Sequence, residues 1–428
     1  MTKDSFVIQG LAGKKSLKGD VFINGAKNAV LKAMAATVLF DDVVALDNVP
    51  DTEDVKKLSA ILKKIGAKVV HDGKKLSIDP RGISSTCLDP ELSESMRASV
   101  VLTGPLLSRF RNVTFPAPGG CVIGTRPIDL FIEGYKKMGA DVDFQKDAYV
   151  MSGKLAGAEI FFNIQTVGGT ETLMMAAVLA EGTTVLKNCA MEPEIVSVAE
   201  YLNSCGAEIV GAGTPTITIK GRAGKLLSSA GKVYITPPDR IEAGSFLLLG
   251  ALLAEKITIK DCNPLHLEVL IHMLKNSGVH IETAPGSITV KSPDSFRSFA
   301  IRTHEYPGFP TDLQSQAVTF LTQAEGEAIV FETIYEGRFK FVQNLLKMGA
   351  HITEMNPREI LVKGPAKLKA TQKDLESFDL RGGFASVMAA LVAEGTSTLQ
   401  NIYYIDRGYE NLEGKLAALG ADIKRIKG

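Results

Sequence analysis

One pattern of apolar and polar positions recurs along the whole chain. In each copy, a helical stretch with lysines on one side precedes a glycine, a small or apolar residue and a short β-prone stretch. Neighbouring copies are 67 to 73 residues apart. A glycine directly after a helix is typical of a left-handed C-cap, so the pattern predicts six helix–turn–strand units. The glycines are Gly66, Gly139, Gly206, Gly278, Gly349 and Gly420.

Each copy also contains an earlier and more apolar helical stretch. These stretches are rich in small residues and apolar nearly all round, which predicts buried helices. The later helices, with their lysines, are expected to lie outside, and the segments between are β-prone. The earlier stretches cover residues 26–40, 95–110, 169–182, 240–255, 311–326 and 382–395.

The length of the repeat bears on the architecture. A unit of roughly 70 residues is long for a solenoid repeat and short for a stable domain. We therefore expect an α/β protein with two sets of three units, each with apolar helices at its centre and sheets around them. The predicted domains are residues 22–234, and residues 1–21 with 235–428, in which a strand near residues 5–10 completes the last set. A helical repeat scaffold without chemistry is the alternative.

Composition narrows the function. The chain has 428 residues, 45% of them hydrophobic, with 48 basic and 48 acidic residues. A net charge of zero provides no global field for nucleic acid or an acidic membrane, so an anionic ligand needs a local cluster of cations. The first residues lack a signal-peptide pattern and the longest apolar runs are too short to span a bilayer. We expect a cytoplasmic protein.

Cysteine and histidine usage argues against a metal. The five cysteines are scattered without a CxxC pair, and the six histidines show no ligand spacing. Neither a disulfide framework nor a zinc site is expected. The sequence therefore predicts a reducing compartment and an activity without metal or cofactor.

One segment interrupts the repeat most strongly. Residues 115–127, FPAPGGCVIGTRP, carry three prolines and three glycines around Cys121. Such a stretch is incompatible with a regular helix or strand and predicts a surface loop with an exposed thiol. A free cysteine is usually buried and inert, but here Arg126 would favour the thiolate or orient an acidic substrate.

Charged residues also recur where the apolar helices begin. Lys27, Arg97, Arg240 and Arg381 hold comparable positions, and helix starts attract anions. Together they suggest a converging anion site, whereas each alone would be a solvated, capping or ion-pairing residue. Asp312 opens another apolar helix, where it either favours the helix dipole or acts as a general base.

Six segments together resemble a known family. They are NGAKNAVLKAMAATVL, APGGCVIGTRPIDL, EPEIVSVAEYLNSCGAEI, TPPDRIEAGSFL, EYPGFPTDLQSQ and IDRGYENLEGKLAALGA. In this order, over nearly the whole chain, they are similar to the UDP-N-acetylglucosamine 1-carboxyvinyltransferases, enolpyruvyl transferases of the EPSP synthase family. The motif around Cys121 is highly specific to them.

The resemblance implies a fold and a reaction. The fold is a two-domain inside-out α/β barrel of six pseudo-repeats, three per domain, with buried helices, sheets outside and the active site in the interdomain cleft. The reaction transfers the enolpyruvyl group of phosphoenolpyruvate to the 3-hydroxyl of UDP-N-acetylglucosamine by addition and elimination, releasing phosphate. It is the first committed step of peptidoglycan synthesis, and no obligatory protein partner is implied.

The resemblance also implies roles for individual residues. Lys27 and Asn28 would bind phosphoenolpyruvate, joined on its phosphate and carboxylate by Arg126 and Arg407. Cys121 would donate a proton and be alkylated by fosfomycin, a covalent inhibitor. Asp312 would accept the proton of the sugar hydroxyl. Contacts to the UDP-sugar would come from Arg97, Arg126, Pro127, Ile128, Asp129, Leu130, Asp312 and Ile334, with Thr166, Val167 and Gly168 near the diphosphate, and Asp379 and Arg381 near the reacting carbons.

The chain departs from the common family pattern at a few positions. Lys32 stands where a proline is frequent, Phe131 replaces a usual polar residue and Gly382 begins a glycine pair after Arg381. Two other functions remain as alternatives. One is the sister enzyme, which acts on shikimate 3-phosphate. The other is a silent relative that binds UDP-sugar for regulation, and it should lack Lys27, Cys121 or Asp312, all of which are present.

The proposed role of Cys121 gives the first testable prediction. The variant Cys121→Ala lacks the nucleophilic thiol, so we expect it to lose sensitivity to fosfomycin and most of its turnover. Time-dependent inactivation by fosfomycin measures the first effect. Undiminished inactivation of this variant would refute the assignment.

Overall fold

The computed structural model describes residues 4–116, 128–371 and 375–428. The chain forms two compact units. We call residues 25–116 and 128–237 the middle unit, and residues 4–24, 238–371 and 375–428, which include both ends of the described chain, the terminal unit.

Three buried helical segments form the centre of the middle unit. They are α1 (Lys27–Ala36), the 3₁₀ helix η3 (Arg97–Leu102) continued by α4 (Thr103–Phe110), and α6 (Val167–Val178). In α6, every residue from Gly169 to Val178 is buried. The more polar helices α2 (Glu53–Lys64), α5 (Asp129–Lys137) and α7 (Pro193–Ser204) each keep an exposed side. These two classes match the prediction of apolar inner and amphipathic outer helices.

The strands of the middle unit form small mixed sheets in the order β13-β3-β5-β4, β6-β8-β7 and β11-β12-β10-β9. Hairpin neighbours are antiparallel, whereas β9 with β10 and β13 with β3 are parallel pairs. The bounds are β3 (Val44–Asp47), β4 (Lys68–Asp72), β5 (Lys75–Asp79), β6 (Asn112–Pro116), β7 (Asp141–Gln145), β8 (Ala148–Ser152), β9 (Glu159–Phe161), β10 (Thr183–Lys187), β11 (Glu208–Val210), β12 (Thr216–Lys220) and β13 (Val233–Ile235).

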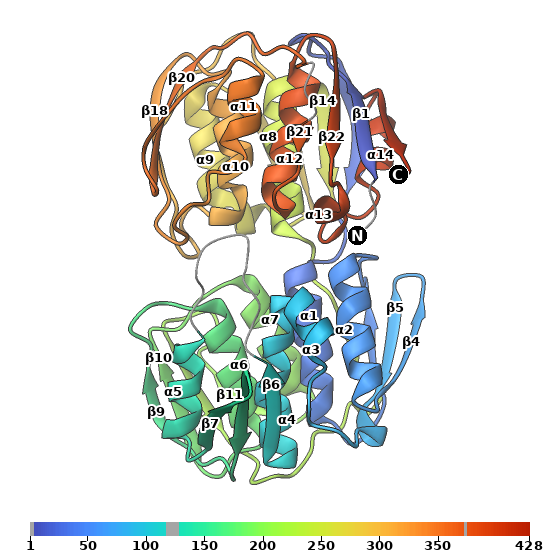
Figure 1. Cartoon of the computed structure of the whole chain (residues 1–428), viewed down its shortest axis with the longest axis vertical. Helices are drawn as coiled ribbons and strands as arrows, with labels where there is room; N and C mark the ends of the chain where they lie inside the picture. Colours follow the sequence, from blue (N-terminus) through green and yellow to red (C-terminus); the bar gives the residue numbers. More distant parts are fainter. Residues whose placement is uncertain (1–3, 117–127, 372–374) are drawn as a thin grey trace. The chain divides into compact units, whose positions relative to one another are not determined.

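The terminal unit repeats this arrangement. Its central helices α8 (Arg240–Leu253), α10 (Gln314–Leu321) and α12 (Leu380–Val392) contact one another, and Figure 1 shows them side by side. The remaining helices are α9 (Glu268–Ser277), α11 (Val342–Lys347), α13 (Tyr403–Asp406) and α14 (Leu412–Ala418). Phe384 of α12 lies edge-on to Phe246 of α8 and stacks on Tyr409, with ring centroids 5.7 and 4.8 Å apart. The core is therefore continuous across these helices.

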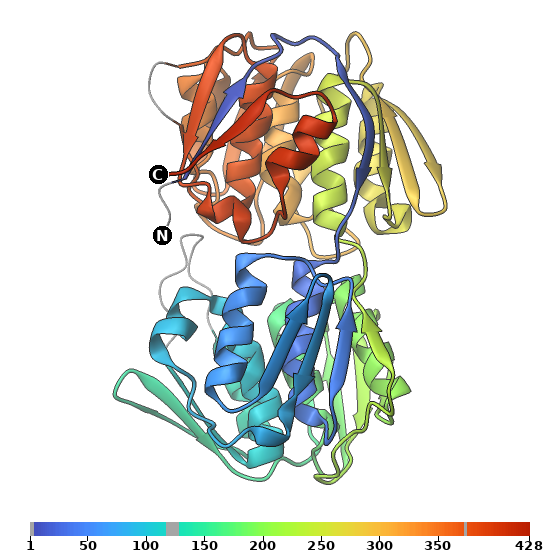
Figure 2. The ribbon, with the colours of Figure 1, turned by 90° about the vertical axis from the view of Figure 1, so that its right-hand side faces the viewer.

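The sheets of the terminal unit have the orders β15-β16-β14-β2, β17-β18-β20-β19 and β21-β22-β1-β23, and Figure 2 shows the β15–β16 hairpin in yellow. As predicted, the first strand joins the last repeat, because β1 pairs with both β22 and β23. The bounds are β1 (Ser5–Gln9), β2 (Leu17–Phe22), β14 (Ala254–Lys260), β15 (His280–Ala284), β16 (Ser287–Lys291), β17 (Ile301–Arg302), β18 (Gly326–Phe331), β19 (His351–Asn356), β20 (Glu359–Gly364), β21 (Leu375–Glu376), β22 (Thr396–Gln400) and β23 (Ile423–Ile426).

The repeated glycines end the outer helices. All six have a positive φ, between 91° and 112°. Side chains other than that of glycine are strained in this left-handed region. The C-caps predicted from the sequence are thus confirmed, and they turn each outer helix into the following strand.

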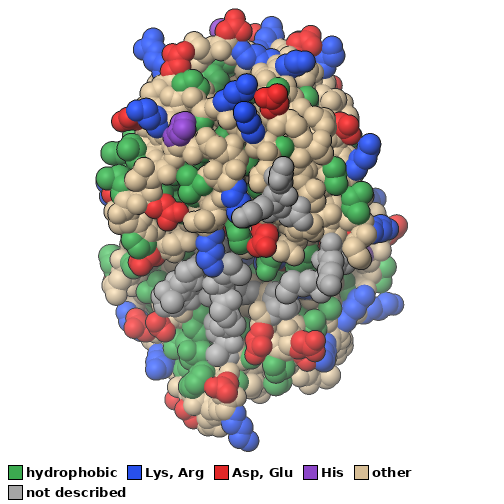
Figure 3. Space-filling view, turned by 45° about the horizontal axis from the view of Figure 1, so that its top comes forward, with side chains coloured by type: hydrophobic (Ala, Val, Ile, Leu, Met, Phe, Trp, Pro, Cys, Tyr) green, Lys and Arg blue, Asp and Glu red, His purple; other side chains and the backbone are tan. Residues whose placement is uncertain are grey.

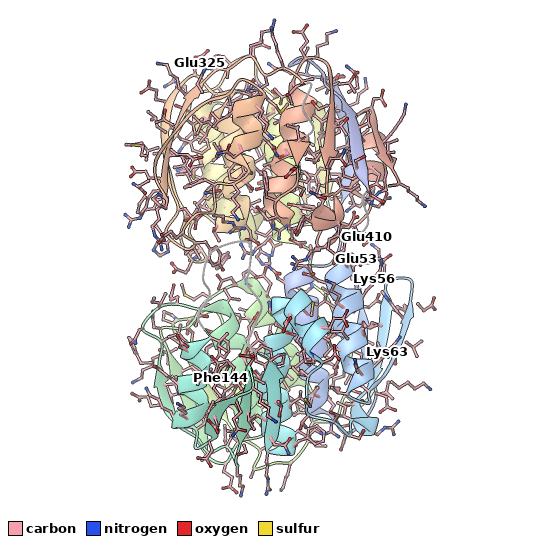
Figure 4. The ribbon with its side chains drawn as sticks, in the orientation of Figure 1. Glu53, Lys56, Lys63, Phe144, Glu325 and Glu410 are labelled. Carbon is pink, nitrogen blue, oxygen red and sulfur yellow. The ribbon has the colours of Figure 1, made fainter. Side chains whose placement is uncertain are left out.

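On the face seen in Figure 3, charges of both signs are interspersed among the described side chains. On α2, Lys56 pairs with Glu53 at 3.1 Å. Lys63 lies in the last turn of this helix, and all three residues are labelled in Figure 4. The acidic first turn and basic last turn suit the helix dipole. No helix in the described parts of the chain has the length and apolarity needed to cross a membrane.

The buried centre of the terminal unit yields a prediction about stability. Leu249 of α8 is 0% exposed, so Leu249→Ala should leave a cavity and lower the free energy of unfolding by about 2–5 kcal/mol. Leu265 is 65% exposed, so Leu265→Ala should change this free energy by less than about 0.5 kcal/mol. Urea denaturation of the two variants measures the difference, and equal losses would contradict the assigned core.

Candidate active site

The four cations of the predicted anion site lie at the starts of central helices. Lys27 begins α1 and Arg97 begins η3 in the middle unit. Arg240 begins α8, and Arg381 is the second residue of α12, in the terminal unit. Helix starts carry unsatisfied backbone N–H groups and a positive dipole end, so each of these positions favours an anion.

Asp312 lies between two buried arginines. It sits in the 3₁₀ helix η5 (Thr311–Leu313), directly before α10. Its Oδ1 accepts a hydrogen bond from Nη2 of Arg338 at 2.8 Å, and its Oδ2 accepts from Nε and Nη2 of Arg381, both at 3.2 Å. The Arg338 and Arg381 side chains are 5% and 3% exposed, whereas that of Asp312 is 29% exposed. The carboxylate of Asp312 is therefore held from two sides and is still accessible to solvent.

A second layer of hydrogen bonds holds Arg338. Its Nη1 donates to Oγ1 of Thr311 at 2.5 Å, and that hydroxyl donates to Oε2 of Glu332 at 2.9 Å. The other oxygen of Glu332 accepts from the backbone N–H groups of Ile334 and Tyr335, at 2.9 and 3.0 Å. Ile334, a predicted site residue, thus lies on a turn that is hydrogen-bonded, through Glu332 and Thr311, to the arginine that holds Asp312.

The start of α12 depends on Asp379 and two glycines. Asp379 is the N-cap, and its Oδ1 accepts from the N–H groups of Arg381 and Gly382 at 2.8 and 3.0 Å. A Cβ at Gly382 would come within 2.9 Å of Oδ2 of Asp379, and one at Gly383 within 2.4 Å of Oγ of Ser377. The glycine pair therefore allows this tight capping turn, which aims Arg381 at Asp312.

Arg381 also packs over an aromatic ring. Its guanidinium carbon lies 5.3 Å from the ring centroid of Tyr409, a favourable cation–π geometry. The Tyr409 hydroxyl accepts from Nε2 of Gln316 at 3.1 Å and lies 2.8 Å from Oγ of Ser245. Burial lowers the pKa of Arg381, but Tyr409 and Asp312 more than offset this, and its pKa is raised overall. Arg381 is thus a permanent cation.

Arg407 follows α13 and is partly buried. The turn that carries it is braced by Arg425, whose Nη1 and Nη2 donate to Asp406 at 2.9 and 2.7 Å. Nε of Arg425 donates to Glu413 at 2.6 Å. The hydrogen bonds from Arg425 to Asp406 and Glu413 therefore restrain the backbone next to Arg407.

In the middle unit, Lys27 is paired with a buried carboxylate. Its Nζ lies 3.1 Å from Oδ2 of Asp54 on α2, and their side chains are 12% and 3% exposed. Asn28 follows it in the first turn of α1. The ion pair fixes the direction of the lysine side chain and holds the start of α1 against α2.

The other predicted residues of this unit also lie at helix starts. Thr166 caps α6, where its Oγ1 accepts from the N–H of Gly169 at 3.1 Å, and Val167 begins the helix. A Cβ at Gly168 would meet no atom within 4 Å, so this turn is open to a ligand. The positions next to the predicted loop also open a helix: Ile128 is the N-cap of α5, and Asp129 and Leu130 form its first turn.

Three predicted residues, Cys121, Arg126 and Pro127, lie outside the described residues. For Arg97, the structure gives the backbone position only. Sequence reasoning missed Arg338, Glu332, Asp54 and Arg425, because nothing in their local sequence separates them from surface charges. Among the described residues, no group of three histidine, cysteine, aspartate or glutamate side chains could hold a metal ion.

A comparison with protein-family models decides the family. Residues 11–416 match the model described as EPSP synthase (3-phosphoshikimate 1-carboxyvinyltransferase). The chain belongs to this family. Its structure is a mixed α/β fold of small mixed sheets, in agreement with the predicted α/β class.

Curated members of the EPSP synthase family are similar over almost their whole length. UDP-N-acetylglucosamine 1-carboxyvinyltransferase 3 of Caldanaerobacter subterraneus is 43% identical over 425 residues, which are 99% of this chain and 100% of the relative. UDP-N-acetylglucosamine 1-carboxyvinyltransferase 2 of Clostridium tetani is 44% identical over 418 residues, 97% of this chain and 98% of the relative.

Solved structures of more distant proteins share the fold. The enolpyruvyl transferase NikO from Streptomyces tendae has a TM-score of 0.89 at 23% identity, with 100% of both chains covered. EPSP synthase from Acinetobacter baumannii has a TM-score of 0.72 at 18% identity, with 99% of this chain and 100% of that chain covered. The fold is thus retained at sequence identities below 25%.

Proposed function

We infer that the protein transfers the enolpyruvyl group of phosphoenolpyruvate to UDP-N-acetylglucosamine, a step in making peptidoglycan precursors. This inference rests on sequence identity. The chain is 43% and 44% identical to two carboxyvinyltransferases named for UDP-N-acetylglucosamine, over essentially complete chains. The site chemistry supports it, since the cations at helix starts suit a substrate that bears a phosphate and a carboxylate.

Asp312 is the proposed general base. Two arginines favour its ionised form, and its partial exposure leaves it accessible to the sugar. In the addition step, the 3-hydroxyl oxygen bonds to the carbon of phosphoenolpyruvate that bears the phosphate, Asp312 takes the hydroxyl proton, and the methylene carbon gains a proton from Cys121. In the elimination step, the methyl carbon loses a proton, the double bond re-forms and phosphate leaves.

The cations have a separate task. Lys27, Arg126, Arg381 and Arg407 are proposed to balance the phosphate and carboxylate charges, with Asn28 as a hydrogen-bonding partner. Because Asp54 already directs the Lys27 ammonium, and Asp379 directs the start of α12, these groups need little reorganisation when an anion binds. Such preorganised charges stabilise a developing transition state better than mobile ones do.

The finer structural and cellular proposals follow from the family. The two units would be the domains of an inside-out barrel, each with three pseudo-repeats. The contacts to the UDP-sugar would come from residues 166–168, 128–130, Arg97 and Ile334, and the reaction would need no metal. We further propose that the protein works in the cytoplasm and is inactivated by fosfomycin at Cys121.

The substrate assignment predicts the outcome of one assay. Phosphate release from phosphoenolpyruvate should require UDP-N-acetylglucosamine and should stay at the background rate with shikimate 3-phosphate. A coupled phosphate assay with each acceptor measures this. The reverse preference would assign the protein to the sister activity, and release with neither acceptor would contradict the proposed function.

The proposed base predicts a separation of binding from turnover. Asp312→Asn keeps the shape of the side chain but cannot accept the hydroxyl proton, so turnover should fall by about 10²–10⁴-fold. Binding of UDP-N-acetylglucosamine, measured by calorimetry, should change little. Asp294→Asn, an exposed aspartate of the same unit paired with Lys15, is the control and should retain activity. Wild-type turnover of Asp312→Asn would exclude the residue as the base.

A further inference from the structure

A buried ion pair joins two central helices of the middle unit. Nζ of Lys32 on α1 lies 3.2 Å from Oε2 of Glu171 on α6. Their side chains are 11% and 0% exposed. Within the described part of the chain, neither carboxylate oxygen of Glu171 has a hydrogen-bond partner, so Lys32 holds it by charge alone. An ion pair this deep and this sparsely hydrogen-bonded is an unusual element of an otherwise apolar helix bundle.

The surroundings of Glu171 disfavour its charge. Burial raises its pKa to about 7, while Lys32 acts in the opposite direction, and Glu194 and Glu192 add to the rise. Tyr234 on β13 also faces this group, and its own pKa is raised by burial. Lys32 is the cation that stabilises the charge of Glu171 most directly, and the acidic groups Glu192 and Glu194 oppose it.

Such a pair contributes little to net stability. Removing two charges from water costs several kcal/mol per ion, and well-packed apolar residues of similar volume are often as stabilising or more so. Buried neighbours on α1 and α6 include the apolar Leu31 and Leu173, although Thr170 and Thr172 flank Glu171 directly. Apolar side chains could fill these two positions as well, so the stability of the fold does not account for the pair.

The position of the pair along each helix suggests another role. Lys32 comes five residues after Lys27, and Glu171 comes five residues after Thr166. At 1.5 Å per residue, each charge lies about 7.5 Å along its helix from a helix start that is proposed to bind substrate. An ion pair at this level fixes the sliding and rotation of α1 relative to α6, which apolar contacts alone restrain less.

We propose that Lys32 and Glu171 are positioning residues that set the start of α1, and with it Lys27 and Asn28, relative to the start of α6. The proposal rests on the proposed function, since it concerns how the phosphoenolpyruvate-binding end of α1 is held. It assigns a specific role to Lys32, which occupies a position where the family frequently has proline.

The test replaces both charges by apolar side chains of similar length. For Lys32→Met/Glu171→Met we expect a midpoint of urea denaturation at or above that of the wild type. We also expect the KM for phosphoenolpyruvate at pH 8 to rise about threefold or more. Lys32→Arg should keep the wild-type KM, because it retains the charge. The exposed pair Lys187 and Glu159, 2.8 Å apart in the same unit, provides the control double variant Lys187→Met/Glu159→Met, for which no change in KM is expected.

A pH series separates positioning from a general packing effect. Because the pKa of Glu171 is raised to about 7, its carboxyl is expected to gain a proton as the pH falls from 8 to 5.5, and the ion pair should be lost with it. The ratio of the double variant's KM to the wild-type KM should therefore fall toward one between pH 8 and pH 5.5. Using the ratio cancels the titration of the substrate.

The possible outcomes distinguish failure of the positioning role from failure of the proposed function. An unchanged KM at pH 8 in a folded double variant, or a raised ratio that does not vary with pH, overturns the proposal. If the double variant is less stable than the wild type, its KM alone is not used. A wild-type KM for Lys32→Arg and a KM ratio that falls at low pH then support the positioning role, and the opposite results overturn it. Failure of the proposed function itself is distinct, since wild-type protein would then release no phosphate with UDP-N-acetylglucosamine.

Discussion

The central helices of this protein cannot face water. They are mostly apolar and are buried around their whole circumference, as in α12, where every residue from Arg381 to Val392 is buried. Such helices must be covered on all sides, and in the terminal unit each of α8, α10 and α12 contacts strands or helices as well as its central neighbours. Because the lengths of these helices are apolar, charged side chains gather at their starts, where backbone N–H groups also point outward. The proposed site residues therefore lie where the core ends.

Charges at these helix starts are organised in pairs and short chains. Asp312 is held by Arg338 and Arg381, Lys27 by Asp54, and the backbone of α12 by Asp379. Each partner lies on a different element from the group it holds, or caps its helix. A side chain fixed in this way keeps its orientation, so little reorganisation is needed when a ligand binds.

The sequence predicts the repeating features well because they are local. Each of the six glycines lies within two residues of the end of its helix, and their left-handed φ values follow from that neighbourhood. Lys27, Arg97, Arg240 and Arg381 also lie at helix starts, as the pattern predicts. Arg338 and Asp54 were not predictable in the same way. Arg338 is 26 residues from Asp312, and Asp54 is 27 residues from Lys27, and no periodicity relates such positions. Only the folded arrangement of separate elements brings them together.

The pairing of β1 with β22 has a consequence for biosynthesis. Gln9 and Thr396 are 387 residues apart and hydrogen-bonded through their side chains. A ribosome that adds about 5–20 residues per second needs about 20–80 s between the two. During that time the first strand has no sheet to join, whereas residues 25–237 can already collapse into their own core. The nascent chain must therefore shield an apolar strand, with Phe6 and Ile8 on one face, until β22 and β23 emerge.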